Sequence, residues 1–348
     1  MINDFLARWT PEELTCLFRL HGHLKTGNIL KIEVTKTFET PPSNLANLTL
    51  TYSPDVSCSE VVKHLLLKAP KPHKLMRGKR EIDFYTKVAP LIPNVPVVPC
   101  FATSYEEKTG ISYLFLADVS ATHATREREI LSPSHLESMI DALAQLHATL
   151  WDYPNLLSLA GESPRECLGY ENGDNEEDYA GLVAQLGEQL TADERKIFEI
   201  FLTDAPKLLL ERAESGQHLT LCHPENHHGN FLLPYQDEAC TYIIDWHQYR
   251  YWWGARDIVS LVNRCLLQEQ LHLTESLLLL YYERLLKYGV TNYAWSDCLS
   301  DYRLGIIDYL TLPLQYQEAY KKYPEFFMRM YRGIMHEFHK WECASILF

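Results

Sequence analysis

The sequence predicts an α+β protein in two parts, a β-rich part over residues 1–118 and a larger helical part over residues 119–348. Between residues 29 and 118, short apolar or alternating runs are separated by Pro, Gly and Asn, as strands and turns are. From residue 134 onward, apolar residues recur mainly at helical spacing. The length of 348 residues also suits two domains better than one.

The first part is expected to begin with a helix and to continue as a five-stranded antiparallel sheet. Thr10 can cap that helix, Pro11 suits its first turn and Glu13 completes a capping box. A turn at residues 41–44 separates the first two strands, and a helix opened by Glu81 follows the third. Strands are expected at residues 29–38, 45–52, 64–70, 95–104 and 111–120.

The second part is expected to be helical, with short strands only around a loop near residue 225. Its clearest helices cover residues 134–150 and residues 274–288, the second ending before Gly289. Residues 219–233 and 241–246 contain the short strands. The acidic segment 166–179 is expected to be an exposed connection.

The charge and the cysteines exclude several classes of protein. With 32 Lys and Arg against 46 Asp and Glu, the net charge of −14 argues against general binding of nucleic acids. The charge suits solubility, and an amine-bearing ligand is the alternative. Nine scattered cysteines without CxxC spacing indicate reduced thiols, and neither a signal segment nor a membrane span is expected. We therefore expect a cytoplasmic protein.

The residues with the clearest chemistry lie in the segments LTLCHPENHHGNFLL and YIIDWHQYR. Glu225 precedes Asn230 by five residues, and Asp245 follows Asn230 by fifteen. A kinase site needs a carboxylate at the substrate hydroxyl, and an amide oxygen and a second carboxylate that hold Mg²⁺ on the phosphates. The order and spacing predict these roles for Glu225, Asn230 and Asp245.

A lysine and a glutamate upstream complete this pattern. Lys68 lies on an expected strand, and Glu81 follows thirteen residues later at the start of an expected helix. A lysine held by a glutamate can reach the α- and β-phosphates of a nucleotide. The alternative for Lys68 alone is a surface lysine at a strand end, but four such elements in this order favour the kinase interpretation.

These segments resemble the aminoglycoside phosphotransferase/choline kinase-like family of small-molecule kinases. The resemblance covers roughly residues 30–265, and some of it leans toward the ecdysteroid-kinase-like branch. The matching segments are Lys68-Ala69-Pro70, Arg80–Tyr85, Leu114–Val119, Leu143–Ala148, His223–Asn230, Ile244-Asp245-Trp246 and Gly254-x2-Asp257.

The resemblance implies a bilobal protein-kinase-like fold, with a small antiparallel β N-lobe and a larger helical C-lobe. It implies ATP and Mg²⁺ as cofactors and a hydroxyl of a small molecule as the phosphate acceptor. Glu225 takes the catalytic position, Asn230 and Asp245 the metal positions, and Lys68 and Glu81 the phosphate positions. Leu116 to Asp118 would form the adenine hinge, and Ser43 would cap the phosphates.

Two departures from the family pattern leave an alternative function open. Glu225 stands where the family has Asp and Pro224 where it has Gly, and the extra methylene moves the carboxylate by about 1 Å unless the loop compensates. The turn at residues 41–44 also lacks the expected glycines. The alternative is therefore a catalytically silent protein that keeps the fold and binds nucleotide.

Other interpretations of the conspicuous residues are less favoured. The order of His223, Glu225 and His227 does not match the H-E-x-x-H zinc motif. The HRD, DFG and APE segments of a protein kinase are absent. His147 is expected to be a core histidine, and Asp257 to cap a helix or hold the loop that contains Glu225. The aromatic cluster at residues 249–253 is expected in the core, with a substrate-lining role as the alternative.

Overall fold

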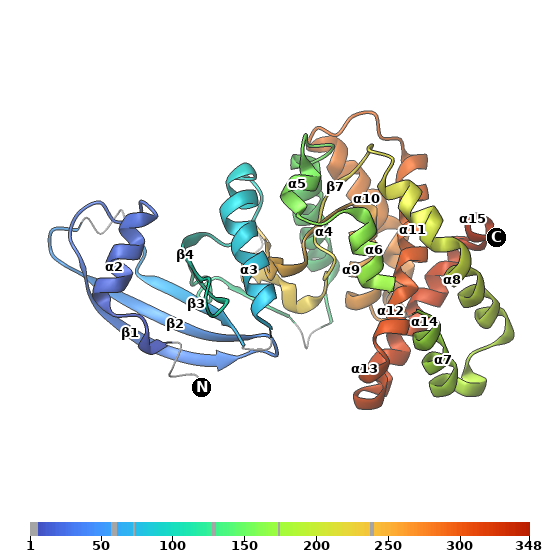
Figure 1. Ribbon diagram of the computed structural model, residues 1–348. Helices are drawn as coiled ribbons and strands as arrows, with labels where there is room; N and C mark the ends of the chain where they lie inside the picture. Colours follow the sequence, from blue (N-terminus) through green and yellow to red (C-terminus); the bar gives the residue numbers. More distant parts are fainter. Residues whose placement is uncertain (1–5, 57–60, 72–73, 127–129, 173–174, 237–239) are drawn as a thin grey trace. The chain divides into compact units, whose positions relative to one another are not determined.

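The computed structural model describes residues 6–56, 61–71, 74–126, 130–172, 175–236 and 240–348. These residues form two compact units, and the chain returns to the first unit once after entering the second (Figure 1). The first unit contains the described residues of Met1–Ala124 and Pro234–Gln248, and the second those of Thr125–Leu233 and Tyr249–Phe348.

A five-stranded sheet in the order β1-β2-β3-β5-β4 forms the centre of the first unit, and every neighbouring pair is antiparallel. This confirms the predicted sheet. The strands are β1 (Ile29–Glu39), β2 (Ser43–Tyr52), β3 (His64–Pro70), β4 (Cys100–Glu106) and β5 (Ile111–Ala117). The shorter strands β6 (His123–Ala124) and β9 (Tyr242–Ile243) belong to the same unit. β4 begins only at Cys100 because Pro96 and Pro99 lack the N–H that a sheet uses.

Helix α2 (Pro11–Leu20) covers one face of this sheet, and its start confirms the predicted capping box. The backbone N–H of Glu13 donates to Thr10 Oγ1 at 3.2 Å, and the Thr10 N–H donates to Glu13 Oε2 at 2.9 Å. Leu14 and Phe18 on its inner face join a core cluster with the apolar side chains of β2, β3 and β5. The sheet thereby buries one face under α2.

Helix α3 (Leu75–Asp83) differs from the prediction, because it begins six residues before Glu81. Glu81 lies near its end and does not open it. The Lys and Arg residues that precede Glu81 are good helix formers, although a helix beginning at Glu81 would leave them outside it. The helix continues as a π-helical turn (Phe84–Val88) and a 3₁₀ turn (Ala89–Leu91).

The second unit is mainly helical, as predicted. Its principal helices are α4 (Pro133–Thr149), α6 (Pro164–Asn172), α7 (Asn175–Leu186), α8 (Ala192–Ala213), α9 (Ala255–Cys265), α10 (Thr274–Lys287), α11 (Trp295–Tyr309) and α14 (Pro324–Lys340). Shorter helices are α5 (Leu156–Ala160), α12 (Thr311–Gln315), α13 (Gln317–Lys322) and α15 (Ala344–Leu347). Short strands are β7 (Thr220–Cys222), β8 (Phe231–Pro234) and β10 (Arg250–Trp252), and β7 pairs with β10. Gly289, at a φ of +100°, follows α10 where the sequence predicted its end.

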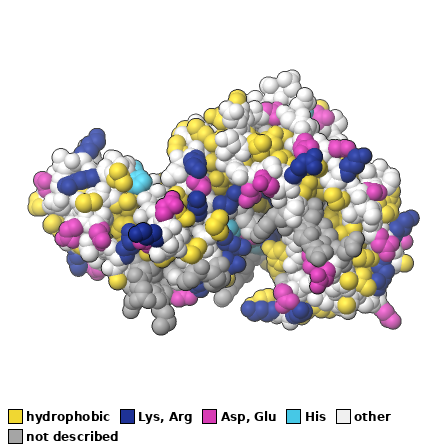
Figure 2. Space-filling view, viewed as in Figure 1, with side chains coloured by type: hydrophobic (Ala, Val, Ile, Leu, Met, Phe, Trp, Pro, Cys, Tyr) yellow, Lys and Arg dark blue, Asp and Glu magenta, His cyan; other side chains and the backbone are white. Residues whose placement is uncertain are grey.

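The acidic segment 166–179 is not the exposed connection that we expected. Its described residues lie in α6 and α7, while residues 173–174 lie outside the described part. Acidic residues are compatible with helix at exposed positions, so their number did not exclude one. On the face in Figure 2, acidic and basic side chains are interspersed.

Among the described residues, no helix combines the length and apolarity that crossing a membrane requires.

Candidate active site

Lys68 lies on the face of β3 opposite to the α2 core. Along this strand Leu65, Leu67 and Ala69 are buried in the core cluster, so the intervening residues Leu66 and Lys68 point to the other face. Helix α3 packs against β3 and β5. The strand alternation therefore directs the ammonium group of Lys68 toward α3.

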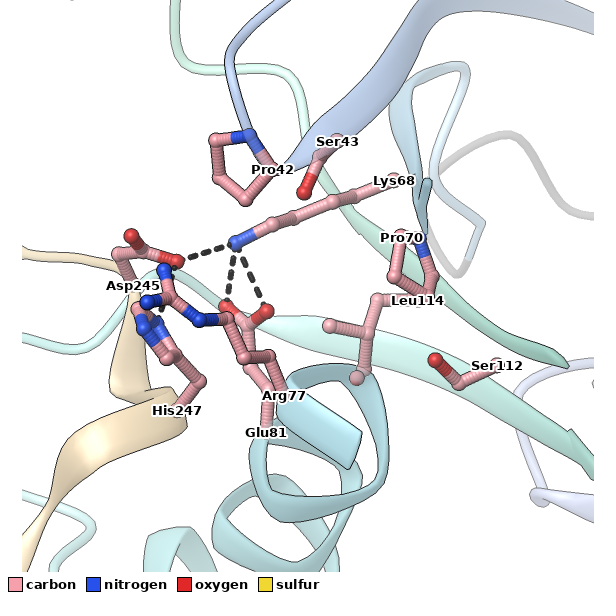
Figure 3. A pocket seen from close by; sticks show the side chains of 11 residues that line it. Pro42, Ser43, Lys68, Pro70, Arg77, Glu81, Ser112, Leu114, Asp245 and His247 are labelled. Atoms are coloured by element: carbon pink, nitrogen blue, oxygen red, sulfur yellow. Dashed lines mark hydrogen bonds and ion pairs between the residues drawn. The ribbon is translucent and has the colours of Figure 1, made fainter. Parts of the chain in front are cut away.

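Glu81 on α3 receives this ammonium group. Lys68 Nζ lies 2.8 Å from Glu81 Oε1 and 2.7 Å from Oε2, so both carboxylate oxygens face the lysine (Figure 3). The Glu81 side chain is 4% exposed and that of Lys68 is 14% exposed. The pair that the sequence predicted is therefore formed, although Glu81 lies at the other end of its helix.

Asp245 contributes a second carboxylate to Lys68, from a position 177 residues away in the sequence. Its Oδ1 lies 2.8 Å from Lys68 Nζ and 3.2 Å from His247 Nδ1. Asp245 has a φ of +70°, a left-handed conformation that is uncommon for a residue with a side chain. Both contacts use Oδ1 and neither uses Oδ2, so the carboxylate retains an oxygen of the kind that Mg²⁺ prefers.

Several contacts hold the segment with Asp245 on the first unit. The Ile243 N–H donates to the Pro96 carbonyl at 3.1 Å. The buried ring of Trp246 stacks on Phe84 at a centroid distance of 3.9 Å and an interplanar angle of 5°. Arg80 Nε donates to the His247 carbonyl at 3.1 Å. These contacts flank Asp245 on both sides and stabilise its left-handed backbone.

The charges of this cluster shift one another's pKa values. Burial disfavours the ammonium of Lys68, but Asp245 and Glu81 outweigh burial and raise the Lys68 pKa. Burial raises the pKa of Glu81, although Lys68 opposes it. Burial alone would raise the pKa of Asp245, but Lys68 and His247 hold it well below its ordinary value. Lys68 and Asp245 are therefore charged near neutral pH.

A small cavity of about 10 Å³ lies beside this cluster. Pro42 lines it from the turn that precedes β2, Ser43 from the first position of β2, and Arg77 from α3, one turn before Glu81 (Figure 3). Within the described part of the chain, Arg77 has no ion pair or hydrogen bond. Arg77 was not predicted from the sequence, because the predicted helix began at Glu81 and excluded it. The i, i+4 spacing of Arg77 and Glu81 would otherwise have placed both on one helix face.

Leu116 and Asp118 lie at the end of β5. Leu116 is buried, and the Asp118 carboxylate accepts hydrogen bonds from Asn47 Nδ2 at 2.6 Å and from the Ser120 N–H at 3.0 Å. Burial opposes ionisation of Asp118, but the bonds from Ser120 and Asn47 lower its pKa. The side chain of Asp118 thus fixes the end of β5 against β2.

In the second unit, Glu225 lies on a loop whose own backbone positions Asn230. The Glu225 carbonyl accepts from Asn230 Nδ2 at 2.9 Å and from the His227 N–H at 3.0 Å. Asn230 is 4% exposed. Because its amide nitrogen is used in this bond, its oxygen is the atom that suits a cation. His227 Nδ1 accepts from the Gly229 N–H at 3.1 Å, so the ring of His227 orders this loop.

Helix α9 anchors the residues on both sides of Glu225. The Pro224 carbonyl accepts from Ser260 Oγ at 2.9 Å and from Arg256 Nη1 at 3.4 Å. Asn226 Nδ2 donates to the Asp257 carbonyl at 3.2 Å. Arg256 and Ser260 were not predicted from the sequence, although their i, i+4 spacing places them on one helix face. The loop is therefore fixed at each neighbour of Glu225.

Asp257 holds the start of the same loop, as the sequence predicted. Its Oδ2 accepts from the His223 N–H at 2.5 Å and lies 3.2 Å from His147 Nε2. His147 is fully buried, and its other ring nitrogen lies 2.9 Å from the Tyr281 hydroxyl, so it is the satisfied core histidine that we expected. A Cβ at Gly254 would lie 2.7 Å from His147 Nδ1, which explains a glycine there.

The structure also bears on the aromatic cluster at residues 249–253 and on the histidines of the loop that contains Glu225. Trp252 and Trp253 are fully buried and stack at 4.8 Å, which confirms a core role for these two. The three histidines of the loop do not combine into a metal-binding group among the described residues.

The model of a phosphotransferase enzyme family matches residues 56–284, more than half of the chain. No curated protein sequence matches this chain.

Solved structures with a similar fold are distant in sequence. A candidate aminoglycoside phosphotransferase from Ralstonia eutropha is 13% identical, with a TM-score of 0.56 over 97% of this chain and 98% of that one. A Plasmodium vivax ethanolamine kinase is 12% identical, with a TM-score of 0.53 over 96% and 92%. A variant of aminoglycoside 2'-phosphotransferase-IIIa bound to GDP is 11% identical, with a TM-score of 0.53 over 95% and 98%. At these identities the likeness shows the bilobal kinase-like fold.

Proposed function

The chain belongs to this phosphotransferase enzyme family, and on that premise we propose that it transfers the γ-phosphoryl group of ATP to a hydroxyl of a small molecule. The observation that carries the proposal is the partly buried Lys68, whose Nζ lies 2.8 Å from Asp245 Oδ1 and 2.7 Å from Glu81 Oε2. Positioned charge of this kind provides most of the catalysis in phosphoryl transfer.

Each predicted site residue has a role in this reaction. Lys68, oriented by Glu81, would contact the α- and β-phosphates, and the Ser43 hydroxyl would cap them. Bound Mg²⁺ would neutralise charge on the phosphates, with Asn230 and Asp245 as its ligands. Leu116 would border the adenine, and Asp118 would contribute its backbone there because its carboxylate is engaged by Asn47 and Ser120.

Glu225 would act on the acceptor. The hydroxyl oxygen forms a bond to the γ-phosphorus while the bond between that phosphorus and the bridging oxygen of ADP breaks. The hydroxyl proton passes to the Glu225 carboxylate, and ADP carries away the electron pair of the broken bond. The anchored carbonyl of Pro224 and the anchored side chain of Asn226 support this role, because they limit how far the longer side chain of Glu225 can shift the loop.

Turnover of ATP with a panel of hydroxyl compounds tests the proposal and separates it from a silent nucleotide-binding protein. Glu225→Gln should lower kcat about 100-fold, because a positioned general base contributes about that factor or more. ATP affinity, measured by calorimetry, should stay within about twofold, since Glu225 is not assigned to the nucleotide.

A control for this experiment tests the requirement for Mg²⁺ separately from the requirement for Glu225. Removal of Mg²⁺ by EDTA should stop the transfer, and added Mg²⁺ should restore it. If the wild-type protein binds Mg-ATP but phosphorylates none of the compounds, including a complete extract of small molecules, the silent protein is the correct interpretation.

Arg77 should strengthen ATP binding without acting in the chemistry. Lys68 is the only cationic side chain assigned to the phosphates so far, and two carboxylates already face it, so the triphosphate benefits from a further positive charge at the cavity. Arg77→Gln should raise the KM for ATP about 10-fold, as loss of one charge-assisted hydrogen bond does, with kcat nearly unchanged.

Lys79→Gln is the matched control for Arg77. Lys79 lies on the same helix and is exposed, with its ammonium 5.5 Å from the ring centroid of Tyr105. Its substitution should leave the KM for ATP unchanged. An equal rise in KM for both variants would show that the helix charge in general, rather than Arg77 itself, acts on the nucleotide.

A further inference from the structure

Arg264, in the last turn of α9, is a buried cation in the second unit. It is 9% exposed, and its Nη2 donates to the Tyr316 hydroxyl at 2.8 Å. Among the described residues, no carboxylate oxygen lies within 4.0 Å of its guanidinium, and Tyr316 is its single hydrogen-bond partner. A buried guanidinium has five N–H donors and normally pairs with an anion, because removing it from water is costly.

Arg264 lies beside the loop that contains Glu225, because the thiol of the next residue, Cys265, donates to the Asn226 carbonyl at 3.8 Å. Burial disfavours the charged guanidinium, but the hydroxyl groups of Tyr309 and Tyr316 and the carboxylate of Glu225 raise its pKa overall. The field of Glu225 therefore reaches Arg264, although the two groups do not form a close ion pair. An acceptor whose hydroxyl approaches Glu225 would bring its other groups into the vicinity of this guanidinium.

A second arginine, Arg329 on α14, adds positive charge to this region. The backbone carbonyl of Met330, the next residue, accepts from Asn263 Nδ2 on α9 at 3.0 Å, so Arg329 lies beside the helix that carries Arg264. The Nε atom of Arg329 is buried and has no hydrogen-bond partner among the described residues. Arg329 and Arg332 also line an open groove with a single carboxylate, that of Glu325. The surroundings of the loop are thus locally basic in a protein whose net charge is −14.

We propose that the phosphate acceptor is a hydroxy compound with a carboxylate or phosphate group, and that Arg264 binds this anionic group beside Glu225. Arg329 favours the approach of the anion through the groove. The guanidinium fork matches the oxygens of either group. The inference rests on the proposed function and replaces the amine-bearing acceptor that the net charge alone suggested.

Fractionation of an extract tests the charge of the acceptor before its identity is known. Small molecules are separated on an anion-exchange resin at pH 7, and each fraction is incubated with the protein, Mg²⁺ and ATP labelled at the γ-phosphate. Labelled product should arise from the retained fraction. Product from the unretained fraction would overturn the anionic acceptor alone, whereas no product from either fraction would overturn the proposed function together with this inference.

Phosphatase treatment of the retained fraction before the assay distinguishes the two anions. A phosphate-bearing acceptor loses its activity after this treatment, and a carboxylate-bearing acceptor keeps it. Either result supports the anionic acceptor, provided that the activity binds to the resin before treatment.

Substitution of Arg264 then tests the residue. Arg264→Gln should raise the KM for the retained acceptor at least about 10-fold, because a charge-assisted contact is lost, while the KM for ATP stays unchanged. Arg329→Gln, at a less buried position, should raise the same KM about threefold and serves if Arg264→Gln does not fold. Arg284→Gln, which removes an arginine bound to Asp141 at 3.0 Å, is the matched control. An unchanged acceptor KM in a folded Arg264→Gln, or in Arg329→Gln alone where the first does not fold, contradicts the assignment.

Discussion

Replacing Lys68 by methionine should lower kcat/KM for phosphate transfer from ATP about 1,000-fold, which is the cost of losing one well-placed electrostatic contact to the transition state. Methionine retains most of the aliphatic length of lysine but not the ammonium that lies 2.8 Å from Asp245 Oδ1. The remaining carboxylates of Glu81 and Asp245 would then repel the phosphates. Steady-state kinetics with varied ATP measures the loss.

Lys71→Met is the matched control for this prediction. Lys71 follows β3 directly and pairs with Glu39 at 2.9 Å, without lining the cavity beside Lys68. Its loss should change kcat/KM less than about twofold, since exposed ion pairs contribute little. A Lys68→Met variant that keeps a tenth or more of the wild-type kcat/KM would show that Lys68 is structural.

The sequence predicted the parts of the fold that depend on local patterns. The capping box at Thr10 and Glu13 and the turn before β2 follow from residues that lie close together in the chain. The short apolar run Leu65–Leu67 likewise predicted a strand that carries Lys68. In each case the information lies within one element, and tertiary packing agrees with it.

Helix boundaries were less predictable in charged segments, which were expected to lie outside helices. The start of α3 at Leu75 and the helices over the acidic segment both contain charged residues with good helix propensity and little apolar periodicity. Such helices gain their stability from packing of a few buried positions, such as Gly78 and Glu81 in α3. Apolar spacing gives little indication of them.

The candidate site was predictable in its residue types but not in its contacts. Motif spacing identified Lys68, Glu81 and Asp245, yet the contact between Lys68 and Asp245 joins residues 177 positions apart. Asp adopts the left-handed conformation more often than most residues with a side chain, but this preference does not single out Asp245 among the Asp residues of the chain. Arg77 and Arg264 lack a recognised motif, and only the structure shows what surrounds each guanidinium.

The second large effect is expected at Asp257, where Asp257→Asn should lower the free energy of unfolding by about 3 kcal/mol at pH 7. Asp257 is fully buried and accepts from the His223 N–H at 2.5 Å, so the substitution removes a buried charge that its neighbours compensate. Urea unfolding of the two proteins at equal pH measures the difference. Asp141→Asn, at a carboxylate about one third exposed, should cost less than about 1 kcal/mol.

The pH dependence of this difference identifies the carboxylate as its cause. Burial would raise the pKa of Asp257, but His147, Arg256 and the His223 N–H lower it below its ordinary value. A lowered pKa in the folded state means that the stabilisation is complete above the unfolded pKa of about 4 and is lost as the pH falls through the folded pKa. The difference between wild type and Asp257→Asn should therefore be constant from pH 7 to about pH 5 and shrink at lower pH. A difference that does not shrink would assign the loss to packing, and the loop with Glu225 would then not depend on the Asp257 charge.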